Sequence, residues 1–597
     1  MCGIVGYIGS KSASIKLLDL IQNLEYRGYD SAGIAVFLNK KIKITKRAGK
    51  IQSLRSQVRV DNSLCGIAHT RWATHGKPNK INAHPHIGAN KEWAVVHNGI
   101  IENFEKLRKD LEKNENIHFI SETDTEVIPQ LMESLHNKNK IDDLIDACNL
   151  LQGSFAIVCI NKHQSDTLFL AKRKSPLYIS LNKDEVFVAS DPICFSESVT
   201  EYYALDDDQF CVATKGKVVF YDKNKNVITK NQIRLGNIKE NSSKEKYKHY
   251  MIKEICETPC VLKSIIKLYS ENNHLQVFNR KFIKKFDKIE IVGCGTAYHA
   301  GLVGATFIRE YAKIEANVQI ASEFRYSKQI INKKTLCLFI SQSGETADTL
   351  IAERLAKRKG ATTVAITNMV HSTLAKNVDI VLPIYAGYEI AVASTKAYSS
   401  QLIVLYMLAK HLKQEIENKN IDYIKTLQIF AKKLRVPKKE ELKKIVQILV
   451  KTDNVFFIGR GVDFITAKEA CLKLKETSYI NCLAYPAGEL KHGYLALIDN
   501  KKYLFVIATD KKVIDKTLSN AHEAYARGAK IVLITQINLP EEKIRFIDRV
   551  IKLQKCNKEL MPIVAIITMQ CLSYYTSIKK GINPDQPRNL AKSVTVE

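Results

Sequence analysis

The chain has 597 residues, of which 45% are hydrophobic and 25% charged, the composition of an ordinary soluble protein that is too long for one core and predicts about three domains. Its formal charge of +28 raises the alternative of nucleic-acid binding, but the lysines are spread along the chain, so we expect a solvated surface and no nucleic-acid partner. The most apolar late stretch, residues 563–575, is shorter than the roughly 20 residues that span a bilayer, so we expect a buried helix and no membrane contact.

The cysteines and the first residues of the chain indicate the cellular compartment of the protein. The fourteen cysteines form no CxxC pairs, and MCGIVGYIG has no basic region before an apolar run, so we expect a cytoplasmic protein without disulfides. His84 and His86 form a close pair, but no nearby Cys or carboxylate completes a metal-ligand set. We therefore expect neither a metal nor an organic cofactor.

Residues 1–235 are rich in short strand-like runs separated by turn residues, including GIVGYIG, AGIAVFL, WAVVHNG, SFAIVCI and KVVFY. Helical periodicity interrupts them at residues 13–25, 103–112 and 125–136. The pattern predicts a layered domain with much sheet.

Cys2 follows the initiator Met. Removal of Met1 leaves Cys2 with a free α-amine, whose pKa of about 7.7–8.0 suits a general base, so nucleophile and base belong to one residue. The alternative is a small buried Cys, which the position before Gly-Ile-Val-Gly disfavours.

Three further clusters fit an acyl-transfer pocket for an amino acid. Arg71 in HTRWATHG suits an α-carboxylate and Asp124 in SETDTE an α-ammonium, while the Asn98 side chain and the Gly99 N–H suit an oxyanion. Taken singly, each has an ordinary alternative: Arg71 as a surface ion pair, Asn98-Gly99 as a tight hairpin turn, and Asp124 as a helix N-cap.

The motifs CGIVGYIG, LEYRGYDSAGIA, HTRWATHG, HNGIIEN and SETDTE together resemble, in this order, the class II glutamine amidotransferases of the N-terminal nucleophile hydrolase type. The resemblance implies an α+β domain with four αββα layers over residues 2–236. It also implies that Cys2 forms a γ-glutamyl thioester, which water resolves to glutamate. By the same resemblance Arg27, Thr74 and His75 support the pocket, and Trp72 gates the ammonia path.

Residues 237–250 are polar and without apolar periodicity, which predicts a linker. Beyond them KIEIVGCGTAYHAG is repeated weakly as NVFFIGRGVDFITA. TLCLFISQS matches KYLFVIATD, and GATTVAITN matches GAKIVLITQ. Strands that alternate with helices predict two similar α/β units with parallel sheets.

The run SQSGETADT follows a strand and opens a helix, so its hydroxyls and backbone N–H groups predict a phosphate cradle rather than a lone capping box. A dinucleotide site is the alternative for the Gly-x-Gly turns, but GCGTAY and GRGVDF both lack the third glycine. On the helix that contains EACLKLKETSYI, Glu469, Lys473 and Glu476 share one face, so acid, base and acid lie together. The alternative for such spacing is a solvated salt-bridge ladder.

The motifs SQSGETADT, VASTKAY, LKLKETSYI, AGELKHG and DQPRNLAKSVTVE resemble the family of isomerizing glutamine–fructose-6-phosphate aminotransferases, and the resemblance covers the whole chain. It implies two flavodoxin-like sugar isomerase domains, residues 251–430 and 431–580, with a catalytic tail, residues 581–597. The implied reaction forms glucosamine 6-phosphate and glutamate from fructose 6-phosphate and glutamine, as the first step of hexosamine (UDP-N-acetylglucosamine) synthesis, with ammonia passed internally.

The same resemblance implies the roles of individual residues. Lys592 forms an imine with the ketose, Glu476 moves a proton between C1 and C2 with help from Lys473, and His492 opens the sugar ring from a partner subunit, which implies a homodimer. The residues implied to hold the sugar phosphate are Thr296, Ser341, Gln342, Ser343, Thr346, Val392 and Ser394.

Two positions depart from the family pattern. Ala297 replaces a hydroxyl residue after GCGT, and Tyr494 replaces the Pro after KHG, which bears on the loop of His492.

Two alternative functions stay open. Other amidotransferases of this class would carry a pyrophosphate-sugar or SGGxDS motif, and neither is present. A sugar-phosphate sensor would not need Cys2, Glu476 or Lys592.

Overall fold

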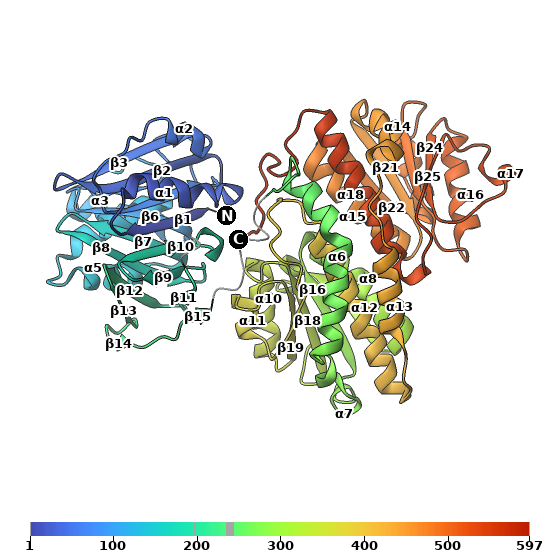
Figure 1. Cartoon of the computed structure of the whole chain (residues 1–597), viewed down its shortest axis with the longest axis horizontal. Coiled ribbons are helices and arrows are strands. Elements are labelled where there is room, and N and C mark those ends of the chain that lie inside the picture. The colour runs from blue at the N-terminus through green and yellow to red at the C-terminus, as the bar shows by residue number, and fades with distance from the viewer. Residues whose placement is uncertain (1, 74, 196–198, 235–243, 596–597) are drawn as a thin grey trace. The chain divides into compact units, whose positions relative to one another are not determined.

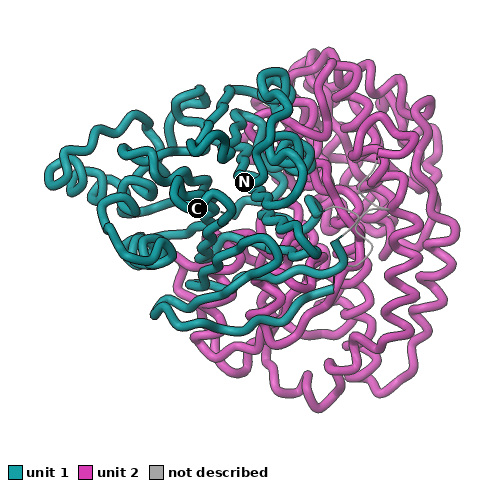
Figure 2. The backbone as a smooth tube through the Cα atoms, turned by 60° about the vertical axis from the view of Figure 1, so that its left-hand side comes forward, with its two compact units in different colours: residues 1–243, 591–597 teal, residues 244–590 magenta. Residues whose placement is uncertain are grey.

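The computed structural model describes residues 2–73, 75–195, 199–234 and 244–595. They fall into two compact units, which Figure 2 colours separately: unit 1 contains residues 1–243 and 591–597, and unit 2 contains residues 244–590. The linker predicted at 237–250 lies partly outside the described residues, and helix α6 (Tyr250–Glu271) begins at its last residue.

Unit 1 contains two antiparallel sheets (Figure 1). The first has the strand order β15-β11-β9-β10-β1-β4-β2-β3, and the second has the order β14-β13-β12-β8-β7-β6-β5. The strands of the first sheet are β1 (Gly3–Ile8), β2 (Ser31–Leu38), β3 (Lys41–Ala48), β4 (Cys65–Arg71), β9 (Tyr178–Asn182), β10 (Glu185–Ala189), β11 (Glu201–Ala204) and β15 (Ile233–Arg234). Those of the second are β5 (His86–Ile87), β6 (Trp93–Ile101), β7 (Gly153–Asn161), β8 (Gln164–Arg173), β12 (Gln209–Thr214), β13 (Lys217–Tyr221) and β14 (Val227–Ile228).

The two sheets face each other across an apolar core. Ile4 and Ile67 of the first sheet share a buried cluster with Val96 and Val158 of the second. Because successive strand residues point to opposite faces, Gly66 lies on the outer face of the first sheet, where Leu17 of helix α1 (Ala13–Gln22) packs against it. Helix α2 (Ile51–Arg55) lies beside α1.

The outer face of the second sheet is covered by the helices α3 (Phe104–Glu115), α4 (Val127–Leu135) and α5 (Lys140–Leu150), whose apolar side chains share a second cluster with that sheet. The helices predicted over 13–25, 103–112 and 125–136 are confirmed as α1, α3 and α4. Helix α5 was not predicted; it buries Leu144 and Ile145 in that cluster.

Unit 2 contains two five-stranded parallel sheets, and the predicted repeat is confirmed because their strands run in equivalent orders. The first order is β17-β16-β18-β19-β20 and the second is β22-β21-β23-β24-β25. The strands are β16 (Lys288–Gly293), β17 (Glu315–Ile320), β18 (Thr335–Ser341), β19 (Thr362–Thr367), β20 (Ile380–Pro383), β21 (Asn454–Gly459), β22 (Asn481–Pro486), β23 (Tyr503–Ile507), β24 (Lys530–Thr535) and β25 (Arg549–Lys552). All residues of β18 are buried, as expected for a strand covered on both faces.

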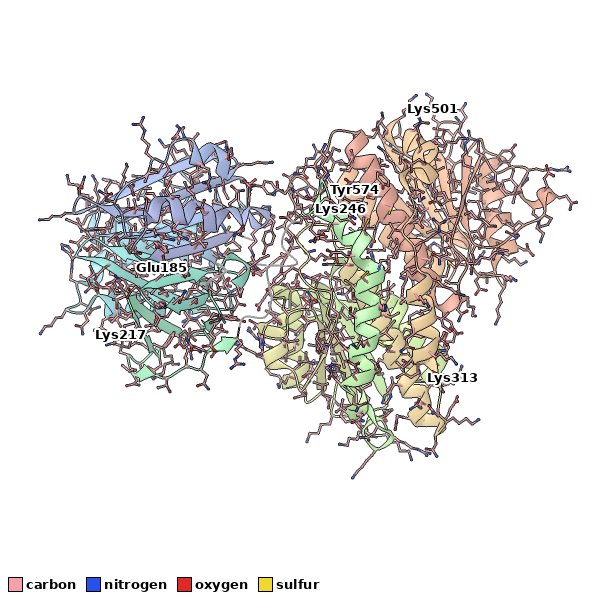
Figure 3. The ribbon with its side chains drawn as sticks, in the orientation of Figure 1. Glu185, Lys217, Lys246, Lys313, Lys501 and Tyr574 are labelled. Atoms are coloured by element: carbon pink, nitrogen blue, oxygen red, sulfur yellow. The ribbon has the colours of Figure 1, made fainter. Side chains whose placement is uncertain are left out.

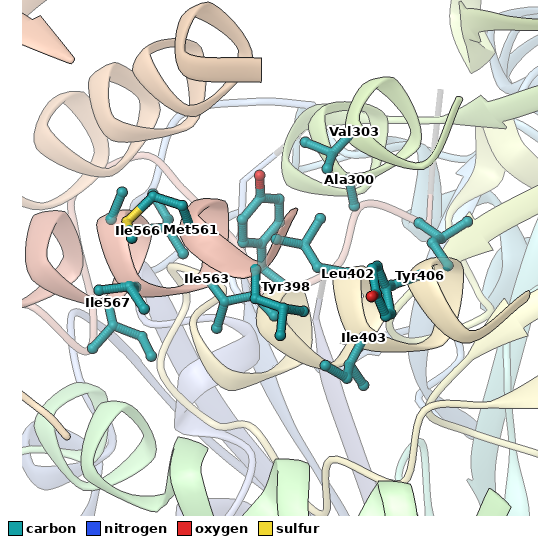
Figure 4. Close-up of a cluster of buried hydrophobic side chains, with 14 of the residues drawn as sticks. Ala300, Val303, Tyr398, Leu402, Ile403, Tyr406, Met561, Ile563, Ile566 and Ile567 are labelled. Atoms are coloured by element: carbon teal, nitrogen blue, oxygen red, sulfur yellow. The ribbon is translucent and has the colours of Figure 1, made fainter. Parts of the chain in front are cut away.

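One apolar core joins the two halves of unit 2 (Figure 4). Ile563 and Ile566 of helix α18 (Met561–Lys579) belong to the same cluster as Leu402 of helix α12 (Lys396–Glu417) and Val303 of helix α8 (Gly295–Phe307). Within the described residues, the segment Lys558–Lys579 is long and apolar enough to cross a membrane, but 89% of its most apolar window is buried inside the protein. The predicted buried helix is therefore confirmed.

Lysines are distributed over both units. Lys217 on β13 belongs to unit 1, and Lys313 and Lys501 lie in separate parts of unit 2 (Figure 3). Their positions on different elements agree with the spread of lysine along the sequence.

Candidate active site

Cys2 is positioned by the pairing of two strands in unit 1. Strands β1 and β4 are antiparallel with Gly3 opposite Thr70, which brings the residue before β1 next to the residues that follow Thr70. The Cys2 Sγ accepts a hydrogen bond from the Trp72 backbone N–H at 3.3 Å. Burial raises the pKa of the Cys2 thiol, while the Trp72 N–H and the positive charge of Arg71 oppose that rise.

Asn98 and Gly99 lie inside strand β6, and Asn98 contacts the backbone of Cys2. The Asn98 Nδ2 donates to the Cys2 carbonyl oxygen at 2.9 Å. Gly99 has a φ of +135°, and a Cβ added there would lie 2.0 Å from the Ser154 carbonyl oxygen, so only glycine fits. The hairpin-turn alternative is wrong, because both residues pair with strand β7.

Arg71 and Asp124 are both buried, at 3% and 4% exposure. The Arg71 guanidinium donates to the carbonyl oxygens of His75, Gly76 and Lys77, so the surface ion-pair alternative is wrong. The Asp124 Oδ2 accepts from the Ile101 N–H at 2.8 Å, across to strand β6, so its side chain does not cap the turn that it begins. Burial lowers the pKa of Arg71, and the negative charges of Cys2 and Asp124 oppose that lowering.

The supporting residues surround this centre. The His75 ring packs edge-on against Phe104 at 5.5 Å between centroids. Arg27 forms an ion pair with Asp191 and donates to the Tyr26 hydroxyl at 3.1 Å. Thr74 lies outside the described residues. Trp72 is partly buried beside Cys2.

His69, which was not predicted from the sequence, contacts the side chain of Asn98. His69 is 1% exposed on strand β4, and its Nε2 lies 3.0 Å from the Asn98 Oδ1. The His84 ring packs against it at 4.1 Å between centroids, and the His86 ring packs against His84 at 4.8 Å. The signal was present in HTRWATHG, where His69 stands two residues before Arg71. Among the described residues, no three His, Cys, Asp or Glu side chains are grouped to hold a metal ion.

In unit 2, the loop predicted to bind phosphate leads from strand β18 to helix α10 (Ala347–Arg358). The Ser341 Oγ lies 3.0 Å from the Thr346 Oγ1 and accepts from the Gly344 N–H at 3.0 Å. The Ser343 Oγ accepts from the Glu345 N–H at 3.2 Å. Serine and threonine oxygens thus gather before the positive end of a helix, a suitable place for an anion.

The backbone of Gln342 joins this loop by a hydrogen bond to the residue that follows the next strand. Its carbonyl oxygen accepts from the Asn368 N–H at 3.1 Å, directly after β19. Gly344 has a φ of +66°, and a Cβ there would lie 2.0 Å from the Ser372 Oγ, so the turn requires glycine.

The loop that carries Val392 and Ser394 is held by two buried carboxylates. Glu254 accepts from the Ile390 and Ala391 N–H groups at 2.6 and 3.0 Å. Glu389 accepts from the Ser394 hydroxyl at 3.0 Å and also from backbone N–H groups that follow it. Neither carboxylate was predicted. Only the fold brings Glu254 of α6 to this loop, whereas Glu389 stands in the loop itself, three residues before Val392.

Helix α15 (Val462–Ser478) presents the residues predicted to act as acid and base to Thr296 of helix α8. Lys473 lies 2.7 Å from the Glu476 carboxylate and 3.4 Å from the Glu469 carboxylate. It also donates to the Thr296 hydroxyl at 3.1 Å, and that hydroxyl donates to Glu469 at 3.0 Å. Lys473 and Glu469 are fully buried, so the solvated-ladder alternative is wrong.

The opposite charges in this network counter the effect of burial on each other's pKa values. Burial alone would lower the pKa of Lys473, but the Glu476 and Glu469 carboxylates raise it above its ordinary value. Burial would likewise raise the pKa of Glu469, but Lys473 and His299 hold it low. His299, which sequence reasoning missed, lies 2.7 Å from Glu469 through its Nδ1.

Two further predicted residues lie on segments that follow helix α15 in the chain. His492 is exposed at the end of a short turn (Ala487–Lys491), and Tyr494 stacks on Tyr485 at 3.5 Å between centroids. Lys592 belongs to the segment 591–597, which groups with unit 1.

The chain before Lys592 is anchored on unit 2. The Asp585 carboxylate accepts from the Tyr250 and Met251 N–H groups at 2.9 and 2.8 Å, at the start of α6. The Arg588 N–H donates to the Tyr479 hydroxyl at 2.7 Å, and the Arg588 guanidinium lies 4.3 Å from the centre of that ring. Tyr479 directly follows α15, which carries Glu476.

Comparison with known proteins covers both units. A family model described as "SIS domain" matches residues 282–411 and 448–580, and one described as "Glutamine amidotransferase domain" matches residues 69–197. A solved structure, the C-terminal domain of glucosamine-fructose-6-phosphate aminotransferase from Francisella tularensis, is 35% identical with a TM-score of 0.52, covering 58% of this chain and 100% of that chain.

Curated relatives match over their whole length. The glutamine–fructose-6-phosphate aminotransferase [isomerizing] of Caldanaerobacter subterraneus subsp. tengcongensis is 43% identical over 613 residues, and that of Bacillus subtilis is 40% identical over 607 residues; each match covers 100% of both chains. With both domain types and the whole length matched, the chain belongs to the family of isomerizing glutamine–fructose-6-phosphate aminotransferases.

Proposed function

We propose that the protein converts D-fructose 6-phosphate and L-glutamine to D-glucosamine 6-phosphate and L-glutamate, the first step of hexosamine synthesis, in the cytoplasm. The observation that carries this proposal is the full-length similarity to curated aminotransferases of this name, at 43% identity. The atoms balance: glutamine and water give glutamate and ammonia, and ammonia and the ketose phosphate give the amino sugar phosphate and water.

Unit 1 is the glutaminase and has the N-terminal nucleophile hydrolase fold of four αββα layers. Its two facing sheets with helices on their outer faces support this assignment. The Cys2 thiol attacks the glutamine carboxamide, and the free α-amine left by removal of Met1 takes the proton. Asn98 and the Gly99 N–H stabilise the oxyanion, supported by the 2.9 Å contact of Asn98 with Cys2.

The remaining residues of unit 1 bind glutamine and control ammonia. Arg71 holds the α-carboxylate and Asp124 the α-ammonium, and His75 and Thr74 have supporting roles in the pocket. Burial of Arg71 and Asp124 supports these roles, because a buried charge needs a charged or polar partner. Trp72 gates the ammonia path; its backbone N–H contact with the Cys2 sulfur places the residue beside the nucleophile, as this role requires.

Unit 2 consumes the ammonia. The phosphate of the sugar binds at Ser341, Gln342, Ser343 and Thr346, with Thr296, Val392 and Ser394 lining the sugar pocket. Glu476 transfers a proton between C1 and C2, and Lys473 stabilises the developing oxyanion as a buried cation next to Glu476, at 2.7 Å. No metal or organic cofactor takes part.

Lys592 forms the imine with the C2 carbonyl of the open-chain ketose. Four residues span at most about 14 Å, so the anchoring of Arg588 on Tyr479 keeps Lys592 within reach of the end of helix α15. His492 opens the sugar ring from a partner subunit of a homodimer, which its exposed position favours.

The test is to incubate the purified chain with glutamine and fructose 6-phosphate and to measure glutamate and amino sugar. We expect the two products in equal amounts, and glutamate without amino sugar would exclude the synthase. Mass spectrometry should find Met1 absent and Cys2 labelled by a glutamine-mimicking electrophile. A Lys592→Ala variant should make no amino sugar, whereas the exposed Lys579→Ala variant should remain active; full activity of Lys592→Ala would favour a sugar-phosphate sensor instead.

A further inference from the structure

We propose that His69 is a positioning residue of the glutaminase centre, which fixes the side-chain amide of Asn98 with its nitrogen toward the reacting carbon. This inference rests on the proposed glutaminase activity of unit 1 and assigns a role to a residue outside the acyl-transfer centre itself.

The contacts of the Asn98 side chain decide which way its amide faces. The Asn98 Nδ2 lies 2.9 Å from the Cys2 carbonyl oxygen, which can only accept a hydrogen bond, so the amide nitrogen must lie on that side. The amide oxygen therefore faces the His69 Nε2 at 3.0 Å.

The neighbours of His69 fix its tautomer in the same way. Its Nε2 lies 3.0 Å from the Asn98 Oδ1 and 3.0 Å from the His97 carbonyl oxygen. Both neighbours are acceptors, so Nε2 must carry the proton and donate it. A neutral imidazole then has its unprotonated nitrogen at Nδ1. The His84 Nδ1 lies 3.1 Å from both ring nitrogens of His69, so the two oxygen acceptors at Nε2 decide the tautomer.

The environment keeps His69 in this single-proton form. The residue is 1% exposed, and the His84 ring packs against it at 4.1 Å between centroids. Burial lowers the pKa of His69 to about 3, so the ring stays neutral wherever the enzyme works.

A carboxamide needs such a fixed donor because its two ends have nearly the same shape. If the amide of Asn98 turned over, its oxygen would face the developing oxyanion and repel it, and one oxyanion donor would be lost. Loss of one such donor lowers kcat by about 10²- to 10³-fold. The His69 N–H disfavours the turned amide, because it would then face the NH₂ group of Asn98 with no acceptor between them.

The experiment compares three replacements of His69. Gln places an N–H near the position of the imidazole Nε2, Asn is too short to reach Asn98, and Leu has no donor. We expect kcat for glutamine hydrolysis to fall about 10²-fold in His69→Leu and His69→Asn, with KM within threefold of wild type. His69→Gln should stay within about tenfold of wild-type kcat.

Two further readouts separate positioning from damage to the fold. Alkylation of Cys2 by iodoacetamide needs no oxyanion stabilisation, so its rate should be unchanged in all three variants. Synthesis of amino sugar from ammonium ions and fructose 6-phosphate should also be unchanged. The exposed His163→Leu variant is the matched control and should keep its full glutaminase kcat.

Several results would overturn the proposal. One is an unchanged kcat in His69→Asn; another is an equal loss in the Gln and Asn variants; a third is a loss in KM alone. If His69→Leu does not fold, the comparison of Gln with Asn decides the question. A wild-type chain that hydrolyses glutamine but makes no amino sugar would refute the sugar chemistry and leave this test intact, whereas one that hydrolyses no glutamine would refute both.

Discussion

Four histidines lie buried around the proposed glutaminase centre, and they should make unit 1 unstable in mild acid. His69, His84, His86 and His97 are each at most 5% exposed. Burial, the largest cause for each, lowers the pKa of all four, that of His69 to about 3. In the unfolded chain a histidine has a pKa of about 6.5.

The sign and size of the effect follow from these values. Because the folded-state pKa is depressed, the stability is fully present above pH 6.5 and is lost as the pH falls, since only the unfolded chain binds the protons. Between pH 7.5 and 5.5 each histidine that stays neutral in the fold costs about 1.4 kcal/mol of unfolding free energy. His69, His84 and His86, whose pKa values are lowered the furthest, together cost about 4 kcal/mol, which approaches the whole stability of many domains.

The two tryptophans of the chain make the assay selective. Trp72 and Trp93 both lie in unit 1, and Trp93 is fully buried, so tryptophan emission during urea unfolding reports on that unit. We expect the unfolding free energy to fall by several kcal/mol from pH 7.5 to 5.5. Replacing His86 by Gln should reduce that fall by about 1.4 kcal/mol, and replacing the exposed His163 should leave it unchanged. A stability that is flat over this pH range would refute the reasoning.

Three further predictions concern single residues. Cys2→Ala should abolish glutamine hydrolysis and leave sugar-phosphate isomerisation partly intact, as measured by separate assays; loss of both activities in a folded variant would contradict the division of labour. Glu469→Gln removes a buried partner of Lys473 and should lower the stability of unit 2 by about 3 kcal/mol in urea unfolding followed by circular dichroism, whereas the exposed Glu441→Gln should change it by less than about 1 kcal/mol. Gly99→Ala would place a methyl group 2.0 Å from a carbonyl oxygen, so glutaminase activity should be lost while ammonia-dependent synthesis remains; retained glutaminase activity would be inconsistent with this geometry.

The sequence alone predicted the features that depend on local pattern. Alternation and apolar runs gave the two parallel-sheet repeats and three of the helices of unit 1, because strand and helix periods are written in neighbouring residues. Helix α5, which lies between α4 and strand β7, was missed although it buries Leu144 and Ile145. The motifs around Cys2 and around Ser341 were found because each lies on one short segment.

Only the tertiary structure decided which distant residues meet. The Glu469–Lys473 pair is visible on one helix, but its full burial and its contacts with Thr296 and His299 require α8 to pack against α15. His69 gained a role in the same way, because the packing of the two sheets brings strand β4 to Asn98 on β6. Such contacts join residues far apart in the chain, and spacing along the sequence carries no information about them.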